Sequence, residues 1–406
     1  MKILHTSDWH LGQSLYNFNR EDEFRDFFVQ IRNIIKQEKP DAMLVSGDIF
    51  DTPAPSNSVV ALYNKELLSI QQENEGMQTI VTAGNHDSPS RLSSAGVLWK
   101  EFGVTVIGTP PRKDGEIDLK QMIVPIKKNG ETLAWVLAVP YMHSSSYPAV
   151  EEGGYGERVE SLYHSLYELA DKEQKDSQPI IAMGHLTLSQ CDVTGHNITI
   201  GSIDTVSTDI WAKGFSYVAL GHIHHRQYIN NEKIRYCGSP LPMSFDEKGG
   251  HSVNIVEFEG REMVSVREID ITPLVDVRTV PAEAASFDEV KQALLDYPND
   301  KSTYLRANIL TEGVMPVDMF GELSACLEEK DQLKLCTLCQ TQKKREIDNS
   351  EQPTILSLDE LKQIQPLDVA KKTYKVRKEE EMPQSLIDCM TEAIAACSTE
   401  GKEDAR

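Results

Sequence analysis

The chain has 406 residues, and its hydrophobic fraction of 40% is sufficient for one large domain with smaller additions. The formal net charge of −22 excludes a protein that binds nucleic acid through a uniformly basic surface, so any DNA contact requires a local basic patch, bound cations or a partner. We expect a cytoplasmic protein, because the apolar amino terminus is too short for a secretion signal and no stretch approaches membrane-spanning length.

Seven cysteines are scattered along the chain, and this odd number argues for reduced thiols over a disulfide framework. Cys336 and Cys339 form the only Cys-x-x-Cys motif. A zinc ribbon requires a second such pair, which the sequence lacks. We therefore expect free thiols on an alternating strand.

The first hundred residues alternate between apolar strands and amphipathic helices. Apolar runs at residues 3–4, 42–45 and 78–81 are typical of strands buried on both faces. Helical spacing of apolar side chains predicts helices over residues 20–36 and 58–72. Strands joined by helices in this order predict a parallel sheet with right-handed crossovers.

The next part of the chain predicts a second, mixed sheet. Strands at 104–107, 121–126 and 134–139 follow one another through turns marked by glycine and proline, with no long helix between them. A helix over about 158–171 then precedes further strands. These strands lie at 179–183, 217–220, 234–237, 253–258 and 263–269.

Five of the apolar strands end in side chains that bind metals. Four of these groups directly follow a glycine, which permits close backbone approach. The carboxyl ends of parallel strands share one edge of a sheet, so we expect the groups to converge. Two pairs have i, i+2 spacing, which in extended backbone points both side chains to one side. The candidate ligands are Asp8, His10, Asp48, Asn85, His185, His222 and His224.

Two carboxylates, one amide and four imidazoles are too many ligands of this kind for one ion. Shared between two ions with Asp48 bridging, they give each ion four protein ligands and leave positions open for water and substrate. Mixed nitrogen and oxygen ligation without thiolate suits Mn, Fe or Zn. Two ions about 3.5 to 4 Å apart activate water and clamp a phosphoryl group.

These motifs resemble a known family. The order and spacing of the five groups are similar to the five signatures of the calcineurin-like metallophosphoesterases. Longer stretches resemble the SbcD nuclease subunits of bacterial SbcCD complexes, which belong to a double-strand-break repair nuclease family. The resemblance is strong over residues 1–272 and fainter beyond. The longer stretches are residues 5–12, 47–51, 219–224 and 236–240.

The resemblance implies a fold and a division into domains. The fold is α/β: a two-sheet β-sandwich flanked by helices, with a small α+β capping domain and a C-terminal helical tail. Residues 1–272 would form the metallophosphoesterase (nuclease) domain and residues 273–347 the capping and DNA-binding domain. Residues 348–406 would be a linker and tail that bind a partner ATPase. The tail includes helices expected over 356–363 and 383–396, which could equally pack on the cap.

The resemblance also implies an activity and roles for single residues. One manganese ion would be held by Asp8, His10, Asp48 and His224, and the other by Asp48, Asn85, His185 and His222. His86 would be the catalytic imidazole. The reaction would be Mn-dependent DNA hydrolysis, as a double-strand exonuclease and a single-strand or hairpin endonuclease, in repair, recombination and replication. The partners would be an SbcC-type coiled-coil ATPase and a second copy of the chain, within a heterotetramer.

One position departs from part of the family. Archaeal and eukaryotic relatives carry a histidine three residues after the bridging aspartate, where this chain has Asp51. One hypothesis is that the carboxylate of Asp51 or of Asp87 bonds His86 and keeps it protonated. The alternative for Asp51 is a turn or capping carboxylate.

Other residues near the motifs are candidates for substrate contact. His225 and Arg226 directly follow the last ligand and could touch substrate phosphate. The basic run 343–345 is a further candidate, although such runs are usually solvated faces.

Two other functions fit parts of the sequence. A nucleotide or small-molecule phosphodiesterase needs the same ligands, but the extra cap and tail favour DNA. A non-catalytic scaffold with the same fold is expected to have lost ligands, whereas all seven and His86 are present.

Overall fold

The computed structural model describes residues 1–150, 152–174, 177–193, 205–211, 214–247, 249–311, 316–342, 367, 371, 374 and 380–391. Contacts divide the chain into two compact units, Met1–Lys343 and Lys344–Arg406. The basic run 343–345, the predicted helix at 356–363 and most of the predicted tail lie outside the described residues, although residues 384–391 are helical. Among the described helices, none combines the length and apolar composition required to cross a lipid bilayer.

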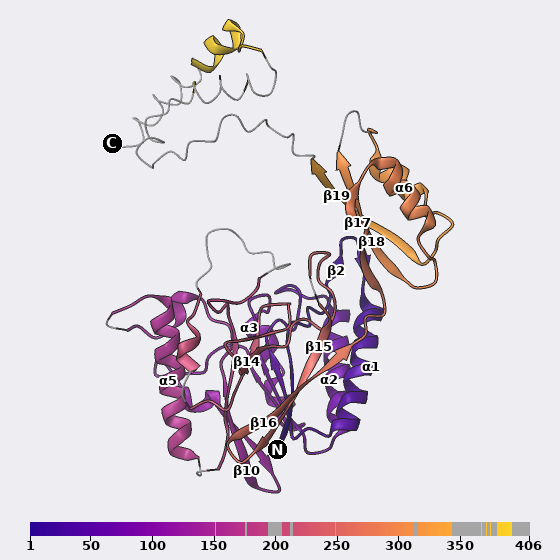
Figure 1. Ribbon diagram of the computed structural model, residues 1–406. Coiled ribbons are helices and arrows are strands. Elements are labelled where there is room, and N and C mark those ends of the chain that lie inside the picture. Colours follow the sequence, from indigo (N-terminus) through magenta and orange to yellow (C-terminus); the bar gives the residue numbers. More distant parts are fainter. Residues whose placement is uncertain are drawn as a thin grey trace. The chain divides into compact units, whose positions relative to one another are not determined.

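The first sheet of the larger unit has six strands (Figure 1). Four of them are parallel, and two long strands from later in the chain add to one side, each antiparallel to its neighbour. In spatial order the strands are β16 (Glu262–Ile271), β15 (His251–Glu259), β1 (Lys2–Thr6), β4 (Ala42–Ser46), β5 (Gln78–Thr82) and β6 (Val104–Ile107).

Strand β6 was wrongly predicted to lie in the second sheet. The structure pairs β6 with β5 in parallel. Two short helices, α3 (Pro89–Ser93) and α4 (Gly96–Lys100), provide the crossover between these strands. They are too short to give a clear helical repeat in the sequence, so the crossover was missed.

The second sheet is mixed, as predicted. Its four central strands are parallel, and its two edge strands are antiparallel to their neighbours. In spatial order the strands are β13 (Gln227–Ile229), β14 (Asn231–Tyr236), β12 (Tyr217–Gly221), β11 (Ile180–His185), β10 (Glu131–Ala138) and β9 (Ile123–Lys128).

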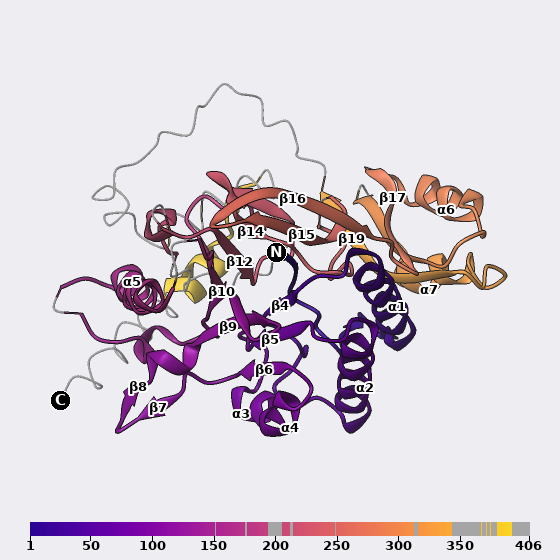
Figure 2. The ribbon, with the colours of Figure 1, turned by 90° about the horizontal axis from the view of Figure 1, so that it is seen from below.

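Helices cover the outer faces of both sheets (Figure 2). Helices α1 (Glu21–Glu38) and α2 (Asn57–Glu73) share one apolar core with the first sheet, and α5 (Tyr155–Glu173) shares another with the second. The remaining short elements are β2 (Ser14–Leu15), β3 (Phe18–Asn19), β7 (Arg112–Lys113), β8 (Glu116–Ile117), η1 (Leu119–Met122), η2 (Ser144–Ser146) and η3 (Thr208–Trp211).

The central strands are apolar on both faces because each face meets a different layer. In β4, Met43 and Val45 pack toward the helices, whereas Leu44 enters a third core shared by the two sheets. In β11, Ile181 lies in this inter-sheet core and Ile180 in the core with α5. Side chains that alternate between two apolar layers produce a four-layer sandwich, and the predicted fold class is confirmed.

Residues 276–342 form the small α+β part of the larger unit. Its sheet has three parallel strands, with its own apolar core. The elements are β17 (Asp276–Ala285), α6 (Phe287–Asp296), β18 (Thr303–Thr311), α7 (Met319–Ala325) and β19 (Leu333–Gln342). Strand β17 was not predicted, because Pro281 interrupts its pattern; the strand lies at the sheet edge, where proline is tolerated.

Side-chain contacts from strand β18 join this small sheet to the sandwich. The hydroxyl of Tyr304 on β18 donates a 3.0 Å hydrogen bond to Glu23 on α1. Arg306, two residues along the same strand, donates a 2.7 Å hydrogen bond to Asp246. Its guanidinium also lies 5.3 Å from the ring centre of Phe245. The segment around residue 245 therefore touches both parts of the larger unit.

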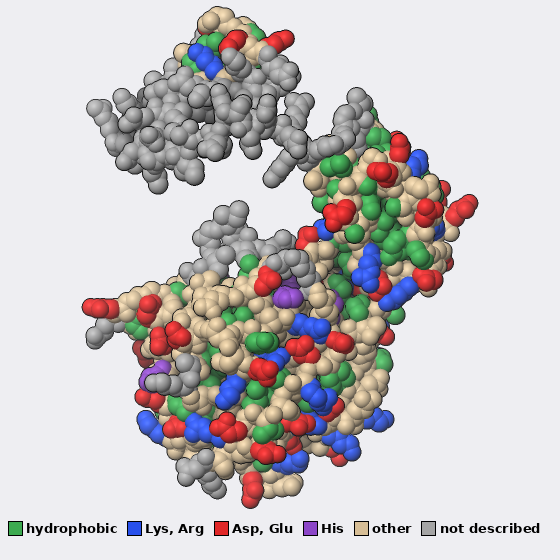
Figure 3. Space-filling model, in the orientation of Figure 1, with side chains coloured by type: hydrophobic (Ala, Val, Ile, Leu, Met, Phe, Trp, Pro, Cys, Tyr) green, Lys and Arg blue, Asp and Glu red, His purple; other side chains and the backbone are tan. Residues whose placement is uncertain are grey.

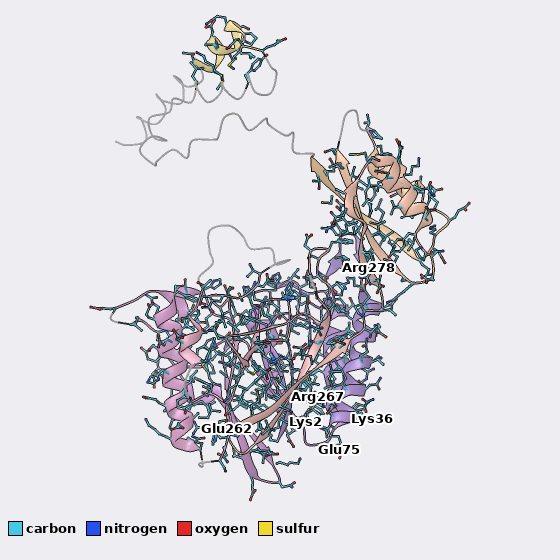
Figure 4. The ribbon with its side chains drawn as sticks, viewed as in Figure 1. Lys2, Lys36, Glu75, Glu262, Arg267 and Arg278 are labelled. Carbon is cyan, nitrogen blue, oxygen red and sulfur yellow. The ribbon has the colours of Figure 1, made fainter. Side chains whose placement is uncertain are left out.

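Charged side chains of both signs are interspersed over the face of the larger unit that Figure 3 shows. Among the basic residues that Figure 4 labels are Lys2 on β1 and Arg267 on β16. Both pair with Glu38 at the end of α1, at 2.9 and 2.8 Å. This shared partner ties the helix end to the first sheet, although such partly exposed pairs contribute little stability individually.

His5 is a buried histidine that links the two sheets without belonging to the predicted ligands. Its Nδ1 lies 2.9 Å from the hydroxyl of Tyr217 on β12. Burial, assisted by the charge of Arg235, lowers the pKa of His5 to about 3. The native state therefore holds His5 neutral at pH values where the unfolded chain protonates it.

A pH-dependent loss of stability is expected from His5. Because the unfolded state binds the proton and the native state does not, stability should fall as pH drops below 6.5, by about 1.4 kcal/mol per unit. The free energy of unfolding in urea, measured in chelator between pH 6 and 4, should fall less steeply for His5→Gln. The exposed His164→Gln variant should keep the wild-type slope. Equal slopes for His5→Gln and wild type would contradict the assignment.

Candidate metal centre and active site

All seven predicted ligands meet at one place, beyond the ends of strands from both sheets. Ligand atoms lie within 4.8 Å of one another in three groups, and Asp48 and His10 each belong to two of them. Asn85 joins through its Oδ1, which is 3.0 Å from both His185 Nε2 and His222 Nδ1. The three groups are Asp8, His10 and His224; His10, Asp48 and His86; and Asp48, His185 and His222.

The backbone reaches this arrangement differently from the predicted extended geometry. Asp8, His10 and Asp48 have positive φ angles of 53°, 46° and 50°, and His222 has a φ of 95°. These residues follow the strands, since β1 ends at Thr6 and β12 at Gly221. The pairs with i, i+2 spacing therefore converge, but not for the predicted reason.

Hydrogen bonds between two loops hold the ligands together. The loop after β1 pairs with the loop after β4, with Asp8 N bonded to Gly47 O and His10 N bonded to Asp48 O, both at 3.0 Å. A Cβ at Gly84 would overlap the Asp48 carboxylate, so glycine is required for this close approach. Paired loops, more than strand direction, thus bring the carboxylates and imidazoles together.

The atoms that face one another around Asp48 are acceptors. His185 Nδ1 donates to the carbonyl of Ser46 at 2.9 Å, since a carbonyl oxygen can only accept. In the neutral ring Nε2 then carries a lone pair, which faces Asn85 Oδ1 at 3.0 Å and Asp48 Oδ2 at 3.3 Å. Acceptors directed at one another are stable only with a cation among them. The residues therefore fit divalent cations bound by nitrogen and oxygen.

Charge distribution supports this assignment. Burial disfavours a charged imidazole, but the Asp48 carboxylate outweighs it and raises the pKa of His185 to about 9. Burial also disfavours a charged carboxylate, yet His185 and His10 hold the pKa of Asp48 well below its usual range. In the metal-free protein a proton thus takes the place of a cation. Metal binding requires release of that proton.

Comparison with known proteins identifies the family. Residues 1–226 match the family model for calcineurin-like phosphoesterases. The chain belongs to the calcineurin-like phosphoesterase family. The predicted family and the predicted class, a metal-dependent phosphoester hydrolase, are confirmed.

Within this family, relatives over most of the chain are named as SbcD-type subunits of the nuclease SbcCD. The protein of Rhodobacter capsulatus is 34% identical over 306 residues, covering 72% of this chain and 75% of the relative. That of Escherichia coli K12 is 31% identical, covering 77% of this chain and 78% of the relative. That of Bacillus subtilis is 32% identical, covering 66% of this chain and 69% of the relative.

Solved structures that match this chain have low sequence identity to it and low TM-scores. A dimetal phosphatase from Danio rerio is 12% identical, with a TM-score of 0.33, covering 67% of this chain and 99% of its own. The phosphopantetheinyl hydrolase of Mycobacterium tuberculosis is 15% identical, with a TM-score of 0.32, covering 59% of this chain and 90% of its own.

His86 of this phosphoesterase is exposed beside the ligands. Its backbone N–H donates to Asp48 Oδ1 at 2.9 Å, and its Nδ1 donates to the backbone carbonyl of Asp51 at 2.8 Å. Its ring centre lies 4.8 Å from that of His10. The bond at Nδ1 fixes the ring, so a substrate would meet the Nε2 side.

The structure differs from the hypothesis that a carboxylate bonds His86. Asp51 contributes its backbone carbonyl, and its carboxylate faces His10 Nδ1 at 3.4 Å. Asp87 is buried and accepts backbone N–H groups of Ile49, Phe50 and Gly84 at 3.1, 2.9 and 2.8 Å. Asp87 therefore fastens the ligand-bearing loops to one another.

The proposed substrate contacts have other partners in the structure. Arg226 donates a 2.6 Å hydrogen bond to Asp270 and lies 3.7 Å from Glu268, both on β16. His225 is half-buried next to it. Their contact with substrate phosphate stays a prediction.

Glu247 is a residue of the site that was not predicted from the sequence. This carboxylate is buried, and its Oε1 lies 3.4 Å from His224 Nδ1. In the sequence, its charged neighbours Asp246 and Lys248 are typical of a solvated loop. The apolar residues at 241–243 and 245 are the one signal that could have indicated that Glu247 is buried.

Proposed function

We propose that the chain is the nuclease subunit of an SbcCD-type complex and hydrolyses DNA with two manganese ions. The observation that carries the proposal is the convergence of seven acceptor ligands with an exposed imidazole at the ends of strands from both sheets. The relatives named as nuclease subunits over about three quarters of the chain support DNA as the substrate.

The ligands divide into two sets that share the Asp48 carboxylate. Asp8, His10, Asp48 and His224 would hold one ion; Asp48, Asn85, His185 and His222 would hold the other. Two divalent ions supply a nucleophile from water at neutral pH and positive charge for the phosphoryl oxygens. They also supply positive charge at the substrate site of a chain whose formal net charge is −22.

His86 would act on the leaving group. Its ring is oriented by the bond from Nδ1 to the Asp51 carbonyl, which leaves Nε2 to face the substrate. An imidazole placed in this way donates a proton to the departing 3′ oxygen or stabilises the charge that develops on phosphate oxygen.

The other predicted parts complete the proposal. The three-stranded sheet of residues 276–342 would cap the site and hold DNA, and the segment beyond residue 348 would bind a coiled-coil ATPase. Duplex cleavage from ends and hairpin cleavage would be the two activities. Pull-down of the full chain with such an ATPase would test the partner.

The activity is tested with purified chain, manganese and three substrates: linear duplex, a DNA hairpin and an aryl phosphodiester. The proposal expects cleavage of both DNA substrates and its loss in chelator. Cleavage of the aryl ester without either DNA would favour the small-molecule phosphodiesterase. Absence of hydrolysis of all three, in chain that retains two ions, would favour the non-catalytic scaffold.

A homodimer is supported by an apolar patch on helix α4 and the turn after it. Val97, Leu98 and Phe102 are 81%, 69% and 51% exposed, which is unusual for neighbouring large apolar side chains. A second copy of the chain would cover them.

Replacing both Val97 and Leu98 by Asp should convert the dimer to a monomer in light scattering. Aryl ester hydrolysis should persist, because the patch contains no ligand. Val264→Asp, on an exposed position of β16, is the matched control and should leave the dimer intact. A wild-type chain that is monomeric at high concentration would refute this interface.

A further inference from the structure

A buried carboxylate lies behind one of the ligand histidines. Glu247 is 6% exposed in its side chain, and its Oε1 lies 3.4 Å from His224 Nδ1. This oxygen has no hydrogen-bond partner among the described residues, whereas Oε2 accepts the backbone N–H of Met243 at 3.0 Å. A buried carboxylate oxygen is stable only beside a donor or positive charge, and an Nδ1–H of His224 would meet this need.

His10 has a similar partner. Asp51 Oδ1 lies 3.4 Å from His10 Nδ1. The Nε2 atoms of His10 and His224 lie 3.1 Å apart, on the sides of the rings away from these carboxylates. Carboxylates behind Nδ1 favour the tautomer with its lone pair on Nε2 and increase the basicity of the ligand atom. Both lone pairs are then directed to one ion position.

The other ion position contains fewer negative groups. There His185 Nδ1 bonds the neutral carbonyl of Ser46, and Asn85 contributes a neutral amide oxygen. Asp48 is shared between the positions, whereas Asp8 groups with His10 and His224. The first position therefore combines more negative charge with more basic imidazoles.

Glu247 is held in place from two sides. Its neighbour Asp246 accepts a 2.7 Å hydrogen bond from Arg306 of β18. The start of the segment is fixed by Arg20, which donates to the carbonyl of Pro242 at 2.7 Å. A carboxylate on such an anchored segment can hold a histidine ring in one orientation.

We propose that Glu247 is a positioning residue that holds His224 for metal binding. With Asp51 behind His10, it makes the position of Asp8, His10 and His224 the tighter of the two, so this position fills first. The inference rests on the two-ion centre of the proposed function.

The test is calorimetric titration of manganese into metal-free full chain. Wild type should show two classes of site, with the tighter class weakened about 10- to 100-fold in Glu247→Gln. The weaker class should be unchanged. Asp51→Asn should weaken the same class, and Glu247→Asp should restore part of the affinity. Glu259→Gln is the matched control, because it makes the same change at an exposed carboxylate at the end of β15, outside the ligand groups.

Further measurements separate positioning from folding. In chelator, the melting temperature of Glu247→Gln should equal or exceed that of wild type, because the amide removes a buried charge. With manganese, its melting temperature should rise less than that of wild type. Equal weakening of both classes, or of neither, would overturn the proposal for Glu247.

The proposed nuclease activity can fail independently of this inference. Wild type that binds two ions in two classes but cleaves no DNA would refute the nuclease activity and leave the role of Glu247 standing. Wild type that binds fewer than two ions would overturn both.

Discussion

Asp48→Asn is expected to empty both ion positions and abolish hydrolysis. The Asp48 carboxylate is buried and faces both sets of ligands, at 3.5 Å from His10 Nε2 and 3.3 Å from His185 Nε2. The amide has the same shape but removes the only negative charge that both ions would share. Loss of several kcal/mol of charge stabilisation corresponds to a decrease in turnover of roughly 10³-fold or more.

The backbone at this position accommodates asparagine without added strain. Asp48 has a φ of 50°, and asparagine tolerates this left-handed region as well as aspartate does. Asp114→Asn is the matched control, because Asp114 has a φ of 53° and is exposed in a turn. Both the turnover and the metal content that remains after dialysis should fall sharply for Asp48→Asn and stay at the wild-type level for Asp114→Asn. Two retained ions with normal turnover would contradict the bridging role.

His86→Gln is expected to slow hydrolysis while leaving metal binding intact. Its contact with Asp48 is made by the backbone N–H, which the substitution retains. Loss of a proton donor typically costs about 10²- to 10⁴-fold in rate. Metal content and melting temperature should match wild type, as should those of the surface control His164→Gln.

The choice of substrate tests what His86 does. A DNA 3′ oxygen leaves poorly without a proton, whereas an aryl oxygen leaves readily as an anion. If His86 is an acid, the substitution should slow DNA hydrolysis far more than aryl ester hydrolysis. Equal losses would indicate stabilisation of phosphate charge, and unchanged rates on both substrates would remove His86 from the mechanism.

The ligand set could be predicted from the sequence because each group of ligands directly follows an apolar strand, although paired loops complete the convergence. Asp48, Asn85 and His185 follow glycines after apolar runs, and both features are visible without a structure. The position of β6 in the first sheet was not predictable in the same way. Its crossover consists of two helices of five residues each, which are too short for a periodic signal.

The roles of the supporting carboxylates could not be predicted, because side-chain direction depends on the folded loops. Asp51 and Asp87 both lie within three residues of a ligand, yet one faces His10 and the other accepts three backbone N–H groups. Glu247 lies more than twenty residues from His224 and reaches it only through the fold. Spacing identifies residues with the right chemistry, but not the neighbour that each one meets.

The left-handed backbone at four ligand positions has a consequence for engineering. Glycine adopts that conformation more easily than histidine or aspartate does. A library of variants at residues 8, 10, 48 and 222, sorted for heat resistance in chelator, should enrich glycine and lose hydrolysis. Directed evolution of a more robust enzyme should therefore keep these four codons fixed and seek its gains in the helices and on the surface.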